Sequence, residues 1–202
     1  MEASYFFQGL AIGFCVAAPI GPIGVLCIRR TLADGSRVGF VSGLGAATAD
    51  ASYSALAGFG LTAVSGLLLQ YRPWFALLGG ILLCYLGVRI FFSKPTESGA
   101  VARGNSLFGA YLSTLVLTLT NVTTIFSFVA IFAGLGIGLS SNYGAAGALV
   151  SGVFLGSTLW WFILSYGVGR LRARMNFAWL RTVNRVAGVA LFLFGLFALS
   201  RW

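Results

Sequence analysis

Asp50 is the residue of this sequence whose chemical type and position most call for a function. It is an acid inside an apolar run, whereas the other three acids lie at the N-terminus or between such runs. A carboxylate at membrane depth is costly and marks a functional site by default. Loss of water favours its protonated form, so Asp50 could carry a proton or meet a cationic group. The alternative is a structural Asp paired with Arg29, Arg30 or an unwound backbone.

Small and hydroxyl-bearing side chains surround Asp50 at helical spacing. Ala46 and Ala47 lie one turn before it and leave room for a ligand, while Tyr53 and Ser54 lie one turn after it. We expect these two hydroxyls to share the hydrogen bonding of the carboxylate. Tyr53 therefore joins Asp50 in the predicted substrate-binding or coupling site.

A cluster of helix breakers interrupts the apolar run at residues 5–28. Pro19 and Pro22 each remove a backbone donor, and Gly21 and Gly24 add freedom nearby. The pattern predicts a helix broken at mid-depth, whose open ends must face protein, water or a ligand. These four residues are assigned to the site. A plain proline kink is the alternative.

The fourth apolar run has a polar interruption without proline. Thr120 and Asn121 lie within the stretch 118–124, and such side chains can replace backbone partners where a helix opens. We assign both to the site. In the alternative, the hydroxyls bond back one turn within an unbroken helix.

Composition indicates an all-α polytopic membrane protein. The 202 residues are 58% hydrophobic and 8% charged, with a mean hydropathy of +0.94, and no ten-residue alternation of a membrane strand appears. We expect a single transmembrane domain over residues 1–202, in contact with the lipid bilayer. Its six predicted spans are 5–28, 39–63, 74–92, 107–139, 143–168 and 183–200.

The basic residues behind the net charge of +9 indicate how the chain is oriented in the membrane. Nucleic-acid binding is the first idea for such a balance, but the basic residues lie in short gaps between apolar runs. Eleven of the 13 Lys and Arg flank or fill the first, third and fifth gaps. The positive-inside rule then puts these gaps in the cytoplasm and both termini outside, with no nucleic-acid partner.

The sequence offers nothing for an enzyme, a cofactor or a metal site. It has no His, and its three Cys lie in apolar runs without metal or redox spacing. No nucleophile–base pair or phosphate-binding loop appears. We therefore expect no catalytic residues, no cofactor and no bound metal.

The two halves of the chain resemble each other. The sequence of residues 41–43 recurs at 150–152, an offset of 109, and the third and sixth runs match at an offset of 108. An odd number of spans per unit inverts the second copy. This predicts inverted three-helix repeats, at about 5–92 and 107–201, an arrangement typical of transporters. Chance similarity among Gly- and Leu-rich helices is the alternative.

Small residues recur every four positions in the second and fifth runs, which allows close helix packing. We expect these two helices to form the central packed pair. A homodimer is left open, because the stripes are equally compatible with packing inside one chain. The stripes are Gly39, Gly43, Ala47, Ala51 and Ala55 in the second run, and Gly144, Ala148, Gly152 and Gly156 in the fifth.

The chain resembles the LysE/RhtB family of bacterial inner-membrane amino-acid exporters. The likeness rests on its size and six spans, on Pro19-Ile20-Gly21-Pro22, on Arg29-Arg30, and on the pattern from Gly43 to Tyr53. The family's fourth helix usually carries Asn-Pro-Lys, where this chain has Asn121-Val122-Thr123. The resemblance implies export of an amino acid or similar small solute across the inner membrane, driven by the proton-motive force.

Two further functions stay in view beside amino-acid export. The wider superfamily includes metal-ion exporters, so a metal cation is the alternative substrate. A membrane scaffold without transport is a third class, against which the broken helix and lone Asp50 argue. In the export hypothesis, the half-helix starting near Gly21 attracts a carboxylate, and Asp50 meets an ammonium group or carries the coupling proton.

Overall fold

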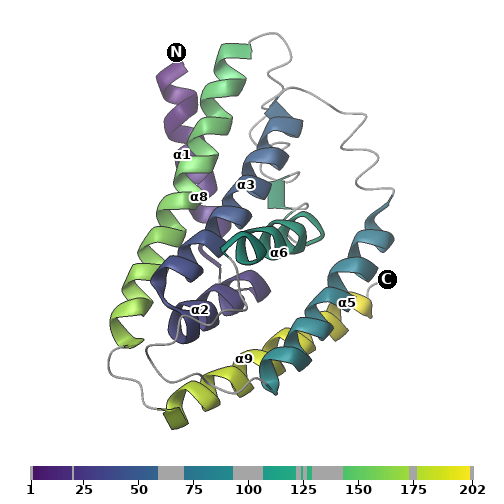
Figure 1. The fold of residues 1–202 in the computed structure, drawn as a ribbon. Coiled ribbons are helices and arrows are strands. Elements are labelled where there is room, and N and C mark those ends of the chain that lie inside the picture. Colours follow the sequence, from purple (N-terminus) through teal and green to yellow (C-terminus); the bar gives the residue numbers. More distant parts are fainter. Residues whose placement is uncertain are drawn as a thin grey trace.

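The computed structural model of the chain is helical throughout the part it describes. It describes residues 2–19, 21–58, 71–92, 107–121, 124, 127–128, 143–172 and 177–200. These residues form seven named helices and no strand, which confirms the all-α prediction (Figure 1). The helices are α1 Glu2–Ala17, α2 Pro22–Asp34, α3 Ser36–Gly58, α5 Arg72–Phe91, α6 Leu107–Leu119, α8 Tyr143–Arg172 and α9 Phe177–Leu199.

The first predicted span is broken where the prolines and glycines lie. α1 ends at Ala17 and α2 begins at Pro22, and the two axes differ by 79°. Pro22 occupies the first turn of α2, where its missing N–H costs nothing and its fixed φ suits the helix. The predicted break between Ala17 and Gly24 is therefore confirmed, and it is far sharper than a proline kink.

The fourth predicted span is interrupted at Asn121. α6 ends at Leu119, Thr120 forms a turn, Asn121 lies in no helix, and Thr124 is helical again. The hydroxyls of Thr118 and Thr120 do bond back one turn, as the unbroken alternative expected, but they do so at the end of α6, before the interruption. Residues 122–123, 125–126 and 129–139 of this predicted span lie outside the described residues.

The helices pack in two groups. α1 lies along α8, and α3 lies between α8 and α6, while α5 and α9 pair beside this bundle (Figure 1). Glycines let α1 and α8 touch: a methyl group on Gly13 or Gly156 would lie 2.1 Å from a backbone oxygen of the other helix. α3 and α8 do pack together, as expected. The fifth-run glycines, however, face α1 and not α3, which corrects that part of the prediction.

Several helices are compatible with a polytopic membrane protein. Among the described residues, Tyr143–Leu171 and Arg181–Leu199 are long and apolar enough to cross a membrane, and the bent pair α1–α2 adds a third if it is one span and not a re-entrant loop. Shorter apolar helices lie at Leu77–Phe91 and Leu107–Leu119. α3 has 23 residues, about 34 Å at 1.5 Å per residue. The number of six crossings stays a prediction.

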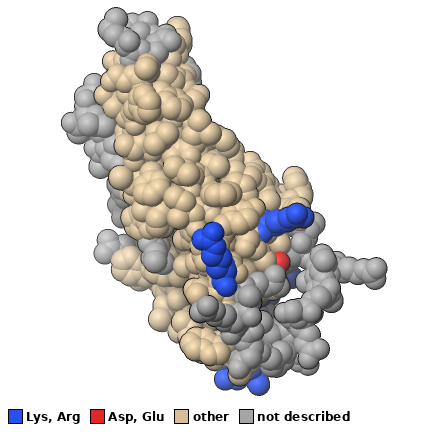
Figure 2. Space-filling view, turned by 90° about the vertical axis from the view of Figure 1, so that its left-hand side faces the viewer, with Lys and Arg blue, Asp and Glu red and all other residues tan. Residues whose placement is uncertain are grey.

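Most of the described arginines gather at one end of the molecule, whereas Arg72 begins α5 at the opposite end of that helix. Arg29 at the end of α2 donates from Nε to Asn184 Oδ1 at 3.0 Å, near the start of α9. Ser36 at the start of α3 lies against Gly169 near the end of α8. Figure 2 shows the basic side chains on the lower part of the visible face, below an uncharged described region. Gly87 near the end of α5 lies against Gly188 at the middle of α9, and the two helices are antiparallel, so the helix end before the third gap lies toward the start of α9. The helix ends at the three basic gaps thus lie at one end of the molecule, as one membrane side would require, and which side this is stays a prediction.

Candidate functional site

A cavity of about 470 Å³ lies where the two interrupted helices end. Its lining comes from the break between α1 and α2, the end of α6, the α3–α8 pair and the α5–α9 pair. The volume falls within the range of about 300–1,000 Å³ that small-molecule sites usually have. The cavity is therefore large enough for an organic solute.

Seven of the eight predicted site residues line this cavity. They are Pro19, Gly21, Pro22, Gly24, Asp50, Thr120 and Asn121. The fold thus brings together three stretches far apart in the sequence. Their role in binding or coupling stays a prediction.

Tyr53 is the predicted site residue that does not line the cavity. It is buried, and its hydroxyl donates to the backbone oxygen of Leu119, the last residue of α6. Because that carbonyl has no helical donor of its own, Tyr53 fixes the end of α6. It thus acts on the cavity wall from behind.

Asp50 is buried against α8, with 3% of its surface exposed. The hydroxyl of Ser157 donates to Asp50 Oδ2 at 2.8 Å. Ser54, which was expected to share the carboxylate, has no hydrogen-bond partner for its hydroxyl among the described residues. Sequence reasoning missed Ser157, because the partner lies on another helix and helical spacing gives no signal for it.

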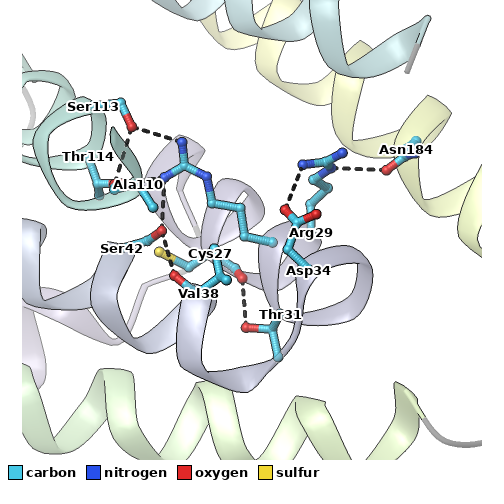
Figure 3. A network of polar contacts seen from close by, with 11 residues as sticks. Cys27, Arg29, Thr31, Asp34, Val38, Ser42, Ala110, Ser113, Thr114 and Asn184 are labelled. Carbon is cyan, nitrogen blue, oxygen red and sulfur yellow. Dashed lines mark hydrogen bonds and ion pairs between the residues drawn. The ribbon is translucent and has the colours of Figure 1, made fainter. Parts of the chain in front are cut away.

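Arg30 is buried, with 7% of its surface exposed, in a cluster of neutral acceptors. Its Nη1 donates to Ser42 Oγ at 2.9 Å, Thr114 Oγ1 at 2.8 Å and the Ala110 oxygen at 3.0 Å. Its Nη2 donates to Ser113 Oγ at 2.8 Å (Figure 3). The guanidinium therefore ties α2 to α3 and α6. The sequence indicated a basic gap and an alternative partner for Asp50 at this position, and gave no sign of these neutral acceptors.

Arg29 is engaged on the other side of α2. It forms an ion pair with Asp34 at 3.2 Å and donates to Asn184 of α9 (Figure 3). Both arginines are thus held away from Asp50. The alternative in which an arginine pairs with Asp50 is therefore wrong.

The break gives the cavity two oppositely polarised backbone ends. Gly21 caps α2 in an extended conformation without a side-chain hydrogen bond, and Pro22 has no N–H. The N–H groups of Ile23 and Gly24 lie in the first turn, where α2 offers no acceptor. These residues line the cavity together with Ala17, the last residue of α1. The start of α2 favours an anion and the end of α1 a cation.

Two walls of the cavity differ in polarity. α3 and α8 contribute Asp50 and Trp161; the indole of Trp161 is 3% exposed, and its Nε1 has no hydrogen-bond partner among the described residues. α5 and α9 contribute only residues without polar side-chain atoms. These are Gly79, Gly80, Leu83, Phe194, Phe197 and Ala198.

Comparison with known proteins agrees with this architecture. The family described as "LysE type translocator" matches residues 14–201. The chain is 24% identical over 197 residues to a Bacillus subtilis (strain 168) protein named "Putative amino acid efflux protein YcgF", covering 95% of this chain and 93% of the relative. No solved structure matches the chain. The family match confirms the resemblance seen in the sequence. The chain belongs to the family of LysE type translocators, and it is a transporter and not an enzyme.

Proposed function

We propose that this transporter exports an amino acid, or a similar small zwitterion, by binding it in the cavity beside Asp50. One observation carries the proposal: a buried carboxylate and the uncapped N-terminus of a half-helix line the same cavity. The similarity to a relative named as an amino-acid efflux protein supports the same substrate class.

A zwitterion matches the polarity of these groups. Its carboxylate fits the N–H groups at the start of α2, where the helix dipole is positive. Its ammonium group fits Asp50, with further acceptors in the last turn of α1. Both charges of the substrate would then be met at one point of the cavity, while the rest of the molecule extends away from the break.

The single carboxylate in the described lining supports a proposal of proton coupling. Protonated Asp50 has lost the charge that attracts the ammonium group, so proton and substrate compete for one site. A transporter that crosses the membrane with one or the other bound exchanges them. The proton-motive force would thereby drive the solute outward, as an antiport.

In the same proposal, the basic end of the molecule faces the cytoplasm of a bacterial inner membrane, and both termini lie outside.

The whole chain forms one domain of two inverted repeats. The helix pairing supports this: Gly80 lies against Gly195, and Gly87 against Gly188. At the repeat offset of 108, each contact maps onto the other. The pair α1–α8 is parallel, since Gly9 lies at Leu149 and Gly13 at Val153. Its counterpart is the parallel pair α3–α6, in which Gly45 lies at Tyr111 and Tyr53 at Leu119.

The metal-cation alternative gains no support from the described residues. Among them, no group of three or more His, Cys, Asp or Glu side chains is placed to hold a metal ion. Divalent cations usually need several such ligands. Transport of a divalent cation is therefore tested beside transport of amino acids, as the alternative result.

The test is uptake into inside-out vesicles from cells that express the chain. Labelled amino acids and divalent cations are offered in turn, with an imposed proton gradient, and vesicles without the protein serve as the control. We expect at least one amino acid to accumulate, and a protonophore to abolish the accumulation. Transport of a divalent cation alone would replace this proposal by the metal alternative. If accumulation persists in the presence of the protonophore, the proposal of proton coupling fails and the proposal of export stands.

A further inference from the structure

We infer from the two unlike walls of the cavity that the exported solute is a neutral amino acid with an apolar side chain. This inference rests on the proposed export function and names the substrate class of the same site. The charged end of the substrate is held at the break and Asp50, and its side chain is directed at α5 and α9.

The two walls belong to different helix pairs. α3 and α8 are joined by the hydrogen bond from Ser157 to Asp50. α5 and α9 are joined through glycines, since a methyl group on Gly87 would lie 2.8 Å from the backbone oxygen of Gly188. The end of α6 adds neutral hydroxyl and amide side chains to the lining, among them Thr120 and Asn121, so the α5–α9 pair is its purely apolar part. In this inference, a solute whose ammonium group reaches Asp50 directs its other end toward that pair.

The α5–α9 wall offers only hydrocarbon to that other end. Leu83, Phe194, Phe197 and Ala198 supply its side chains. A basic side chain would need a second carboxylate there, and an acidic one would need Lys or Arg. Neither type is found in the described lining apart from Asp50, which already meets the ammonium group. A charged side chain would thus be buried without a partner, which costs far more than burying an aliphatic one.

Ala198 leaves space on this wall, because its side chain is the smallest of the four. A branched aliphatic group of the solute can fill that space, so a larger residue at position 198 would restrict the size of the accepted side chain. Ala198→Leu occupies that space. A pocket change of this kind alters discrimination by about 10–200-fold when one methylene is at stake. We therefore expect the variant to lose leucine transport and to retain alanine transport.

The first experiment compares substrates in the wild-type vesicles. Leucine, alanine, lysine and glutamate are offered separately under the same proton gradient. We expect leucine and alanine to accumulate, and lysine and glutamate to accumulate at least about tenfold less. Lysine or glutamate transport equal to that of leucine overturns the inference and leaves amino-acid export standing. If no amino acid moves, the proposed function itself fails.

The second experiment compares Ala198→Leu with Ala178→Leu, a matched change at an exposed position of α9 outside the cavity lining. We expect the leucine-to-alanine transport ratio to fall at least about tenfold in Ala198→Leu only. Phe197→Ala enlarges the same wall and should raise the phenylalanine-to-leucine ratio, so it serves if the first variant does not reach the membrane. Unchanged ratios in both cavity variants would show that α9 does not contact the side chain.

Discussion

Asp50→Asn removes the charge from the cavity while preserving its shape. The amide keeps an oxygen where Asp50 Oδ2 accepts the proton of Ser157. A hydrogen bond to a charged group is worth about 1.5–3 kcal/mol and a neutral one about 0.5–1.5 kcal/mol, so the variant loses about 1 kcal/mol. In return it no longer pays the cost of about 2.5–3.5 kcal/mol for an Asp at membrane depth. We expect it to insert normally and to be at least as stable as the wild type.

Transport should nevertheless be lost in this variant. An amide binds no coupling proton and offers no negative charge to an ammonium group. The assay measures proton-driven amino-acid accumulation in vesicles across a pH series, together with the amount of protein in the membrane. Asp34→Asn is the matched control, because it removes an acid that pairs with Arg29 outside the cavity. Wild-type accumulation by Asp50→Asn at every pH would refute both roles of the carboxylate, and failure to reach the membrane would favour a structural one.

Four other outcomes follow from the packing and the charge distribution. Arg30→Met should lower the free energy of unfolding by at least about 1.5 kcal/mol, the lower value for one hydrogen bond to a charged group, as a thermal melt in detergent would show. Gly156→Leu should force α1 from α8 and reduce the amount of folded protein, whereas unaltered folding would contradict the close approach. Tyr53→Phe should cost about 1 kcal/mol in the same melt and keep its substrate preference, because the hydroxyl acts on α6 and not on the solute. A cysteine at Ser36 should resist an impermeant reagent in spheroplasts while one at Ser141 reacts, and the reverse pattern would invert the topology.

The local interruptions were readable from the sequence because their causes are local. Pro19 and Pro22 remove donors and clash with the preceding turn wherever they lie in a helix. The polar stretch at Asn121 likewise coincides with the end of α6. Asp50 stood out because burying a charge is costly in any fold.

The partners of these groups could not be read in the same way. Ser157 reaches Asp50 only because α3 crosses α8 at that level. Arg30 was interpreted as a mark of the cytoplasmic surface, yet it is buried among hydroxyls of α3 and α6. The polarity of the α5–α9 wall was equally hidden, since an apolar run looks the same whether a given face meets lipid, protein or a cavity.

The short helix α2 connects the cavity to the basic end of the molecule. Its first turn lines the cavity, and its last two turns carry Arg29 and Arg30, which bind α9 on one side and α3 and α6 on the other. With 13 residues it is about 20 Å long, so both sets of contacts act on one rigid element. An exporter must open its site to each side in turn, and a motion of α2 that opened the cavity toward the basic end would break the hydrogen bonds of Arg30. We therefore expect these bonds to favour the state in which α2 stays packed on α3 and α6, and Arg30→Met to shift the conformational balance as well as the melting temperature.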